Sequence, residues 1–159
     1  YVPAPRQTTR QSLIVHGVSQ TISELAQQEC HSMARKTFFS GSKFEDMAGY
    51  CRAISDGRWV IVSGTSGHNA KTGEISDDVQ EQTRESLRTI EGALNEAQSG
   101  LQDIVRMRVF VAERAYVMPV SAVLKEHFEK IRPTNTTIVS VLADVTMKVE
   151  LEVTALRPE

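Results

Sequence analysis

The chain has 159 residues, a formal net charge of −2, 40% hydrophobic residues and 24% charged residues. This length and composition predict a single globular domain. The slightly acidic balance argues against a nucleic-acid-binding protein, which would carry a basic surface. Cys30 and Cys51 form no Cys-x-x-Cys motif and have no histidine at ligand spacing. We therefore expect no metal site and a reducing, cytoplasmic compartment. No apolar run approaches the roughly 20 residues that a membrane helix requires.

Residues 1–35 are predicted to be an extension that precedes the domain, which we place at residues 36–159. Its arginines and serines suit a mitochondrial presequence, and a mitochondrial location is the alternative to a cytoplasmic one. Glu24 and Glu29 argue against it, because presequences are poor in acids. An appended arm without chemistry, or an arm held by a neighbouring subunit, are the other interpretations, and its role stays open.

The first half of the domain predicts three strands. Residues 36–40 form a short strand candidate. Residues 50–55 and 58–63 flank an Asp-Gly dipeptide, which is a strong hairpin signal because a type I′ turn needs positive φ at both central residues. The unbroken apolar run at 59–62 is typical of a strand that is covered on both faces.

An amphipathic helix and a strand follow. Apolar residues recur at steps of three or four from Val79 to Ala97. Asp77 is the predicted N-cap and Gly100 the predicted C-terminal glycine. Residues 103–111 alternate like a strand, with Val105, Met107, Val109 and Val111 on one side.

A second helix is predicted to start near Pro119, and two strands complete the domain. Pro133 ends the helix and starts a strand, while residues 148–155 form the clearest alternating strand. Asn135 would lie close to Glu150 if these two strands were neighbours. The order β-β-β-α-β-α-β-β predicts an α+β protein with one mixed sheet and two helices on one face. The other face then needs a cover, so an oligomer with polar clefts is expected.

Several short segments carry a resemblance by their order and spacing. They are Gly49-Tyr50-Cys51-Arg52-Ala53, Val62-Ser63-Gly64, Lys71-Thr72-Gly73-Glu74, Glu81-Gln82-Thr83, Arg132-Pro133 and Lys148-Val149-Glu150-Leu151-Glu152. Together they resemble the RidA family, also called YjgF or endoribonuclease L-PSP, from about Thr37 to Ala155. The resemblance implies a chorismate-mutase-like protomer with a six-stranded sheet, and a homotrimer with a ligand cleft at each subunit interface. It also implies hydrolysis of reactive enamines and imines from amino-acid metabolism to ammonia and a 2-keto acid, without a metal or organic cofactor.

The resemblance assigns roles to individual residues. Glu150 matches the glutamate that positions the hydrolytic water, and Tyr50 matches a tyrosine that lines the cleft. Ser63 and Gly64 match a strand end whose backbone lines the pocket, where glycine permits close approach of a ligand. Ser121 occupies the place where active deaminases carry an asparagine. The structural alternatives are a solvated strand face for Glu150, a half-buried aromatic residue for Tyr50 and a helix-surface serine for Ser121.

One position departs from the active deaminases. They carry an arginine two residues after the proline that corresponds to Pro133, and it grips the substrate carboxylate. Here Asn135 stands at that position, and it has neither the charge nor the bidentate fork of arginine. Our hypothesis is that Arg52 supplies the missing cation for a small acidic ligand. The alternative is a structural ion pair between Arg52 and Glu150 or Glu152.

Two classes of function follow. The first is a hydrolase of imines or enamines, which the retained Tyr50 and Glu150 favour. The second is a non-catalytic trimer that binds a small metabolite or a partner protein, which Asn135 favours. The expected partners are further copies of the chain and a small acidic metabolite, with neither a membrane nor a nucleic acid among them. A ribonuclease activity would follow only from an older family name.

Overall fold

The computed structural model describes residues 35–158 of the chain. The strands are β1 (Lys36–Phe38), β2 (Ala53–Asp56), β3 (Trp59–Ser66), β4 (Ile104–Val111), β5 (Thr134–Val139) and β6 (Val149–Leu156), and the helices are α2 (Lys43–Ala48), α3 (Val79–Glu96) and α4 (Val117–Phe128). The predicted N-terminal extension and Cys30 lie outside the described residues, apart from Arg35. Within the described part, no helix is both long and apolar enough to cross a membrane.

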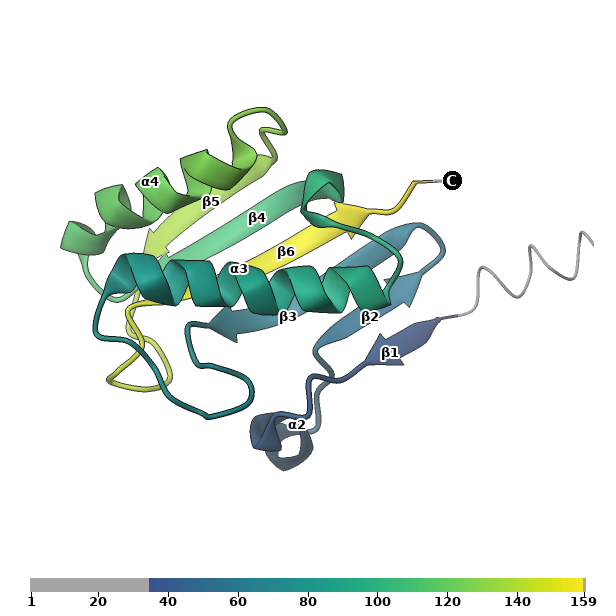
Figure 1. Ribbon diagram of the computed structural model, residues 1–159, viewed down its shortest axis with the longest axis horizontal. Coiled ribbons are helices and arrows are strands. Elements are labelled where there is room, and N and C mark those ends of the chain that lie inside the picture. The colour runs from purple at the N-terminus through teal and green to yellow at the C-terminus, as the bar shows by residue number, and fades with distance from the viewer. Residues whose placement is uncertain (1–34, 159) are drawn as a thin grey trace, which may run out of the picture. The chain divides into compact units, whose positions relative to one another are not determined.

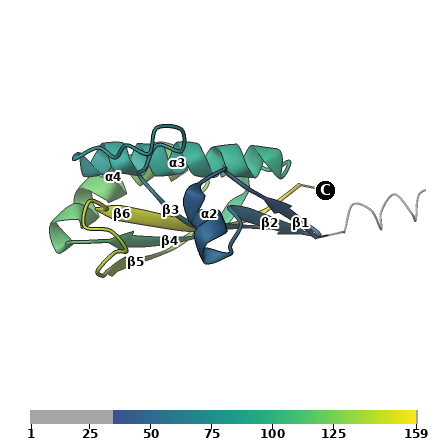
Figure 2. The same ribbon diagram turned by 90° about the horizontal axis from the view of Figure 1, so that it is seen from below.

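The strands form one mixed sheet with the order β1-β2-β3-β6-β4-β5. β4 and β5 run parallel, and every other neighbouring pair is antiparallel. α3 and α4 cover the same face of the sheet (Figures 1 and 2). The predicted α+β architecture is confirmed. Because β6 lies between β3 and β4, β5 and β6 are not neighbours, so Asn135 on β5 does not lie beside Glu150 on β6.

A short helix that we did not predict, α2, connects β1 to β2. Ser42 caps it by accepting a hydrogen bond from the Phe44 amide at 3.4 Å. Gly49 ends it in the left-handed conformation at φ 70°, which glycine adopts without strain. Both cap signals are visible in the sequence, but the segment has too few apolar residues to show a helical period.

The core lies between the sheet and the helices. It contains Val60, Val62, Leu87, Ile90, Leu94, Ile104, Met107, Val109, Val111, Val120, Val123, Val149, Leu151 and Val153. The regular alternation of β6 places alternate residues from Val149 to Ala155 under the helices, as predicted. β4 departs from the prediction at one residue, because a register irregularity between Ile104 and Arg106 leaves Val105 exposed and buries Ile104 instead.

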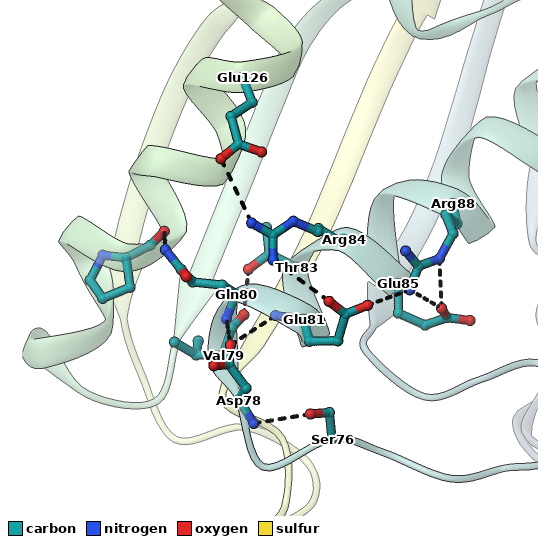
Figure 3. A network of polar contacts seen from close by, with 11 residues as sticks. Ser76, Asp78, Val79, Gln80, Glu81, Thr83, Arg84, Glu85, Arg88 and Glu126 are labelled. Atoms are coloured by element: carbon teal, nitrogen blue, oxygen red, sulfur yellow. Dashed lines mark hydrogen bonds and ion pairs between the residues drawn. The ribbon is translucent and has the colours of Figure 1, made fainter.

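The boundaries of the two long helices also differ from the prediction. Asp78, not Asp77, is the N-cap of α3, and its Oδ1 accepts from the amides of Gln80 at 2.7 Å and Glu81 at 3.0 Å (Figure 3). α3 ends at Glu96, before Gly100, and Gln98 takes the positive φ of 58°. α4 begins at Val117, before Pro119, so the proline lies within its first turn.

The outer surface of α3 carries ion pairs. Arg88 bridges Glu81 and Glu85 on α3, and Arg84 reaches Glu126 on α4 at 3.7 Å (Figure 3). These pairs are solvent-exposed, so each stabilises the fold by at most about 1 kcal/mol. The apolar contacts beneath them hold the two helices on the sheet.

The face of the sheet opposite the helices is open in the protomer. Trp59 and Ile61 are 51% and 52% exposed, whereas Val60 and Val62, which alternate with them, are fully buried. The predicted cover on both faces of residues 59–62 is therefore present on one face only. At the sheet edge, every residue of β5 is exposed, including Ile138 and Val139. The protomer thus presents apolar side chains on a face and an edge that a second chain would cover.

Candidate functional site

Five of the residues that we predicted from the sequence gather at one end of the middle strands. Tyr50 and Arg52 lie just before β2, Ser63 and Gly64 lie in the second half of β3, and Glu150 is near the start of β6. β3 pairs with both β2 and β6, so it brings the two segments together.

An irregularity in β3 shapes this end of the sheet. The register between β3 and β6 shifts between Val62 and Thr65, and such bulges often occur beside functional sites. A Cβ atom on Gly64 would lie 2.5 Å from Oε1 of Glu150, so only glycine leaves room for this carboxylate. Ser63 ties the bulge to the neighbouring segment, because its amide donates to the Arg52 carbonyl at 2.9 Å and its hydroxyl to the Cys51 carbonyl at 2.8 Å.

Arg52 is buried, with 7% of the residue exposed, and its guanidinium donates in several directions. Nε donates to Glu45 Oε1 at 3.2 Å. Nη1 donates to the Gly64 carbonyl at 2.9 Å and to the Thr65 hydroxyl at 3.0 Å. Nη2 has one longer contact, 3.5 Å to the hydroxyl of Tyr50.

The ion pair of Arg52 is with Glu45, a residue that we did not single out from the sequence. Glu45 is 3% exposed and also accepts from the Ser40 amide at 3.0 Å and the Ser40 hydroxyl at 2.6 Å. The expected alternative, an ion pair with Glu150 or Glu152, is wrong, and Glu152 bonds to Arg108 at 3.1 Å instead. The capping pattern Ser42-x-x-Glu45 was the available signal for a structured glutamate here.

Glu150 is half-buried on the sheet face opposite the helices. Burial raises the pKa of its carboxyl group, the positive charge of Arg52 lowers it, and the negative charge of Glu152 raises it, with a net upward shift. Within residues 35–158, no side chain or amide donates a hydrogen bond to this carboxylate. Its oxygens are therefore available to a water molecule or a ligand, and a raised pKa favours the protonated form that a proton-exchanging carboxyl group must also reach.

The other two predicted site residues lie elsewhere in the protomer. Ser121 is on the exposed side of α4, and its hydroxyl donates to the Val117 carbonyl at 2.7 Å. Asn135 is on edge strand β5, where its Oδ1 accepts from the Thr137 hydroxyl at 3.0 Å. These contacts match ordinary surface roles, and one chain does not bring either side chain to Glu150.

A hollow of about 550 Å³ lies beside Arg52 but outside this group of residues. Its lining residues include Phe38, Phe39, Ser40, Arg52, Lys71, Glu85, Arg88, Gly92 and Glu96. Tyr50, Gly64 and Glu150 are not among them, so the hollow and the candidate site meet only at Arg52. In the described part of the chain, no cluster of three or more histidine, cysteine or carboxylate side chains could hold a metal.

Comparisons with known proteins agree on one family. A family model described as Endoribonuclease L-PSP matches residues 40–157. The chain is 34% identical over 119 residues to an uncharacterized protein of Streptomyces coelicolor, which covers 74% of this chain and 89% of that protein. It is 29% identical over 111 residues to the 2-iminobutanoate/2-iminopropanoate deaminase of Escherichia coli, covering 68% and 87% of the two chains.

The solved structures give the same result. Rv2704 of Mycobacterium tuberculosis, described as a member of the YjgF/YER057c/UK114 family, is 37% identical, with a TM-score of 0.71 over 77% of this chain and 99% of that one. Escherichia coli TdcF, solved with bound serine, is 28% identical, with a TM-score of 0.65 over 69% of this chain and 88% of that one. The family match, the relatives and the fold together show that the chain belongs to the endoribonuclease L-PSP family, also known as YjgF or RidA.

Proposed function

We propose that the protein hydrolyses a carbon–nitrogen bond of a small reactive imine or enamine at the site around Glu150. The main support is Glu150 itself, a half-buried carboxylate that has a raised pKa and no hydrogen-bond donor among the described residues. Relatives that cover most of the chain are named as deaminases of 2-imino acids and of reactive intermediates, which supports the same reaction type.

The reaction needs one water molecule and one proton relay. Glu150 accepts a hydrogen bond from the water and orients its oxygen toward the imine carbon. As the carbon–oxygen bond forms, Glu150 takes a proton from the water and the imine π electrons move to nitrogen. Glu150 then returns this proton to nitrogen, which gives a carbinolamine. Glu150 next moves the proton of the new hydroxyl group to nitrogen, the carbon–nitrogen bond breaks as the carbonyl forms, and ammonia leaves. A carboxyl group with a raised pKa suits both steps, because it must gain and lose a proton in each cycle.

We propose that a second copy of the chain completes this site within a homotrimer. The exposed apolar side chains of Trp59, Ile61, Ile138 and Val139 support such an assembly. Ser121 on α4 and Asn135 on β5 do not lie beside Glu150 within one chain. In the trimer they would reach the cleft from the neighbouring subunit. Light scattering of the purified full-length protein should give three times the 17.7 kDa chain mass. A monomer at micromolar concentration would contradict this assembly.

The polar end of the ligand is proposed to lie against Arg52 and Tyr50. Their contact at 3.5 Å places a guanidinium nitrogen and a phenol side by side. The small acidic ligand that we expected from the sequence would have to bind here without a cation at position 135, which is asparagine.

The test follows the decay of 2-iminobutanoate and of its amide, 2-iminobutanamide, each generated in situ, with and without the protein. The wild-type protein should accelerate the decay of at least one of them, and Glu150→Gln should reduce that acceleration at least tenfold. Glu152→Gln is the matched control, because it makes the same change two residues away on the same face, where the carboxylate bonds to Arg108. If the wild-type protein gives no acceleration for this imine or its amide, or if both variants behave alike, the catalytic proposal fails. The non-catalytic binding protein would then be the better interpretation.

A further inference from the structure

We infer that this site recognises its ligand through a single oxygen atom, and that Glu45 imposes this selectivity by occupying one edge of Arg52. The inference names the ligand class for the proposed site and so rests on that proposed location. It concerns binding, however, and it does not require that the protein be catalytic.

The first step is the geometry of the guanidinium. Arginine grips a carboxylate with two parallel hydrogen bonds, either from Nη1 and Nη2 or from Nε and Nη2. In this chain Nε of Arg52 donates to Glu45, and Nη1 donates to both the Gly64 carbonyl and the Thr65 hydroxyl. Each of the two forks therefore lacks one of its donors. Only Nη2 has no acceptor closer than 3.5 Å among the described residues.

The remaining donors converge on one position. Nη2 of Arg52 lies 3.5 Å from the Tyr50 hydroxyl, and the guanidinium carbon lies 5.7 Å from the centre of the Tyr50 ring. An oxygen that accepts from Nη2 can therefore also accept from the phenol. One carbonyl oxygen satisfies this pair, whereas the second oxygen of a carboxylate would find no further guanidinium donor.

The charges around the site support the same conclusion. Glu45 neutralises Arg52 at 3.2 Å, and Arg108 neutralises Glu152 at 3.1 Å. Glu150 then remains as the acidic group without an ion-pair partner, and position 135 adds no cation because it is asparagine. A carboxylate ligand would thus enter a site without excess positive charge, whereas a neutral carbonyl compound meets no repulsion.

The role of Glu45 is built into the fold. Ser42 and Gly49 cap α2, and this short helix holds the Glu45 side chain inside the protein. The Ser40 amide and hydroxyl fix its carboxylate, so that Oε1 points at Arg52 Nε. The favoured ligands are therefore neutral imines, enamines and their carbonyl products, such as the amide of a 2-imino acid, and free 2-imino acids are not favoured.

The test compares two product analogues, 2-oxobutanoate and its primary amide 2-oxobutanamide, by titration calorimetry on the full-length protein. The amide should bind at least as tightly as the acid. A preference of tenfold or more for the acid, or no detectable binding of the amide, would overturn the inference. This comparison uses the wild-type protein, so it does not depend on whether any variant folds.

Glu45→Ala tests the residue directly. Freeing Nε opens the Nε–Nη2 fork, so the affinity for the acid relative to the amide should rise about tenfold, the effect of one additional charge-assisted hydrogen bond. Asp46→Ala is the matched control, because it removes the same charge from the same helix at an exposed residue. An equal ratio of acid affinity to amide affinity in the two variants would refute the role of Glu45. If the amide is preferred but no imine is hydrolysed, this inference stands and the catalytic proposal fails. If an imine is hydrolysed but the acid is preferred tenfold or more, the catalytic proposal stands and this inference fails.

Discussion

Replacing Gln82 with leucine should destabilise the protein more than any surface change on the same helix. Gln82 is fully buried on α3, and its side-chain amide joins two segments that lead to the site. Nε2 donates to the carbonyls of Ser76 at 2.6 Å and Thr146 at 2.9 Å, while Oε1 accepts from the Lys148 amide at 2.8 Å. The last of these bonds fixes the chain two residues before Glu150.

The magnitude follows from these three hydrogen bonds. Each is worth about 0.5–1.5 kcal/mol net, so Gln82→Leu should lower the free energy of unfolding by about 3 kcal/mol. In a chain of this length the loss corresponds to a fall in Tm of roughly 6–12 °C. Thermal unfolding followed by circular dichroism measures it. Gln80→Leu is the control, since its amide makes one marginal contact of 3.5 Å to Pro119. Equal melting temperatures for the two variants would refute this account of the buried amide.

Two further predictions concern the site. Gly64→Ala should reduce imine hydrolysis at least tenfold with little change in Tm, because the three atoms nearest to the added methyl group all belong to the movable side chain of Glu150. Normal activity in the decay assay would contradict this prediction. Because burial raises the pKa of Glu150, the folded state favours the protonated form, and this contribution to stability is lost as pH rises through the raised pKa. Glu150→Gln should therefore stabilise the protein at pH 8 but not below the ordinary carboxyl pKa of about 4.3, as measured by urea unfolding at both pH values. An equal difference in the free energy of unfolding between variant and wild type at both pH values would contradict burial of Glu150 as the cause.

The fold was largely predictable because its elements have strong periods. The alternation of β6, the Asp-Gly hairpin signal before β3 and the apolar stripe of α3 each predict an element that is present. The hairpin turns one residue later than predicted, at Gly57 and Arg58, and of these two only Gly57 has a positive φ, so the turn is not the type I′ turn that we expected. The misses are local. Two adjacent aspartates offered the same N-cap, and only the geometry selects Asp78. α2 was missed because a helix of six residues is too short for a period to show.

The site was less predictable, for a different reason. Periodicity does not reveal that β6 inserts between β3 and β4, and this strand order decides that Glu150 joins Gly64 and not Asn135. The partner of Arg52 was also missed, because the capping pattern around Glu45 indicates a structured glutamate but does not show which cation it meets. The residues that the family resemblance assigned to one cleft are thus divided within the protomer between the β2–β3–β6 part of the sheet, and β5 and α4.

This division changes what Asn135 implies. If the asparagine alone had replaced a carboxylate-binding arginine, the simplest consequence would be a weakened deaminase. Glu45, however, occupies the Nε donor of Arg52, the residue whose positive charge acts on Glu150 in the described part of the chain. Under the inference above, two positions on different elements withhold the same contact, the grip on a carboxylate, while Glu150, the proposed catalytic group, stays available to a ligand. A ligand class without a carboxylate accounts for both residues, whereas a weakened deaminase accounts for Asn135 alone.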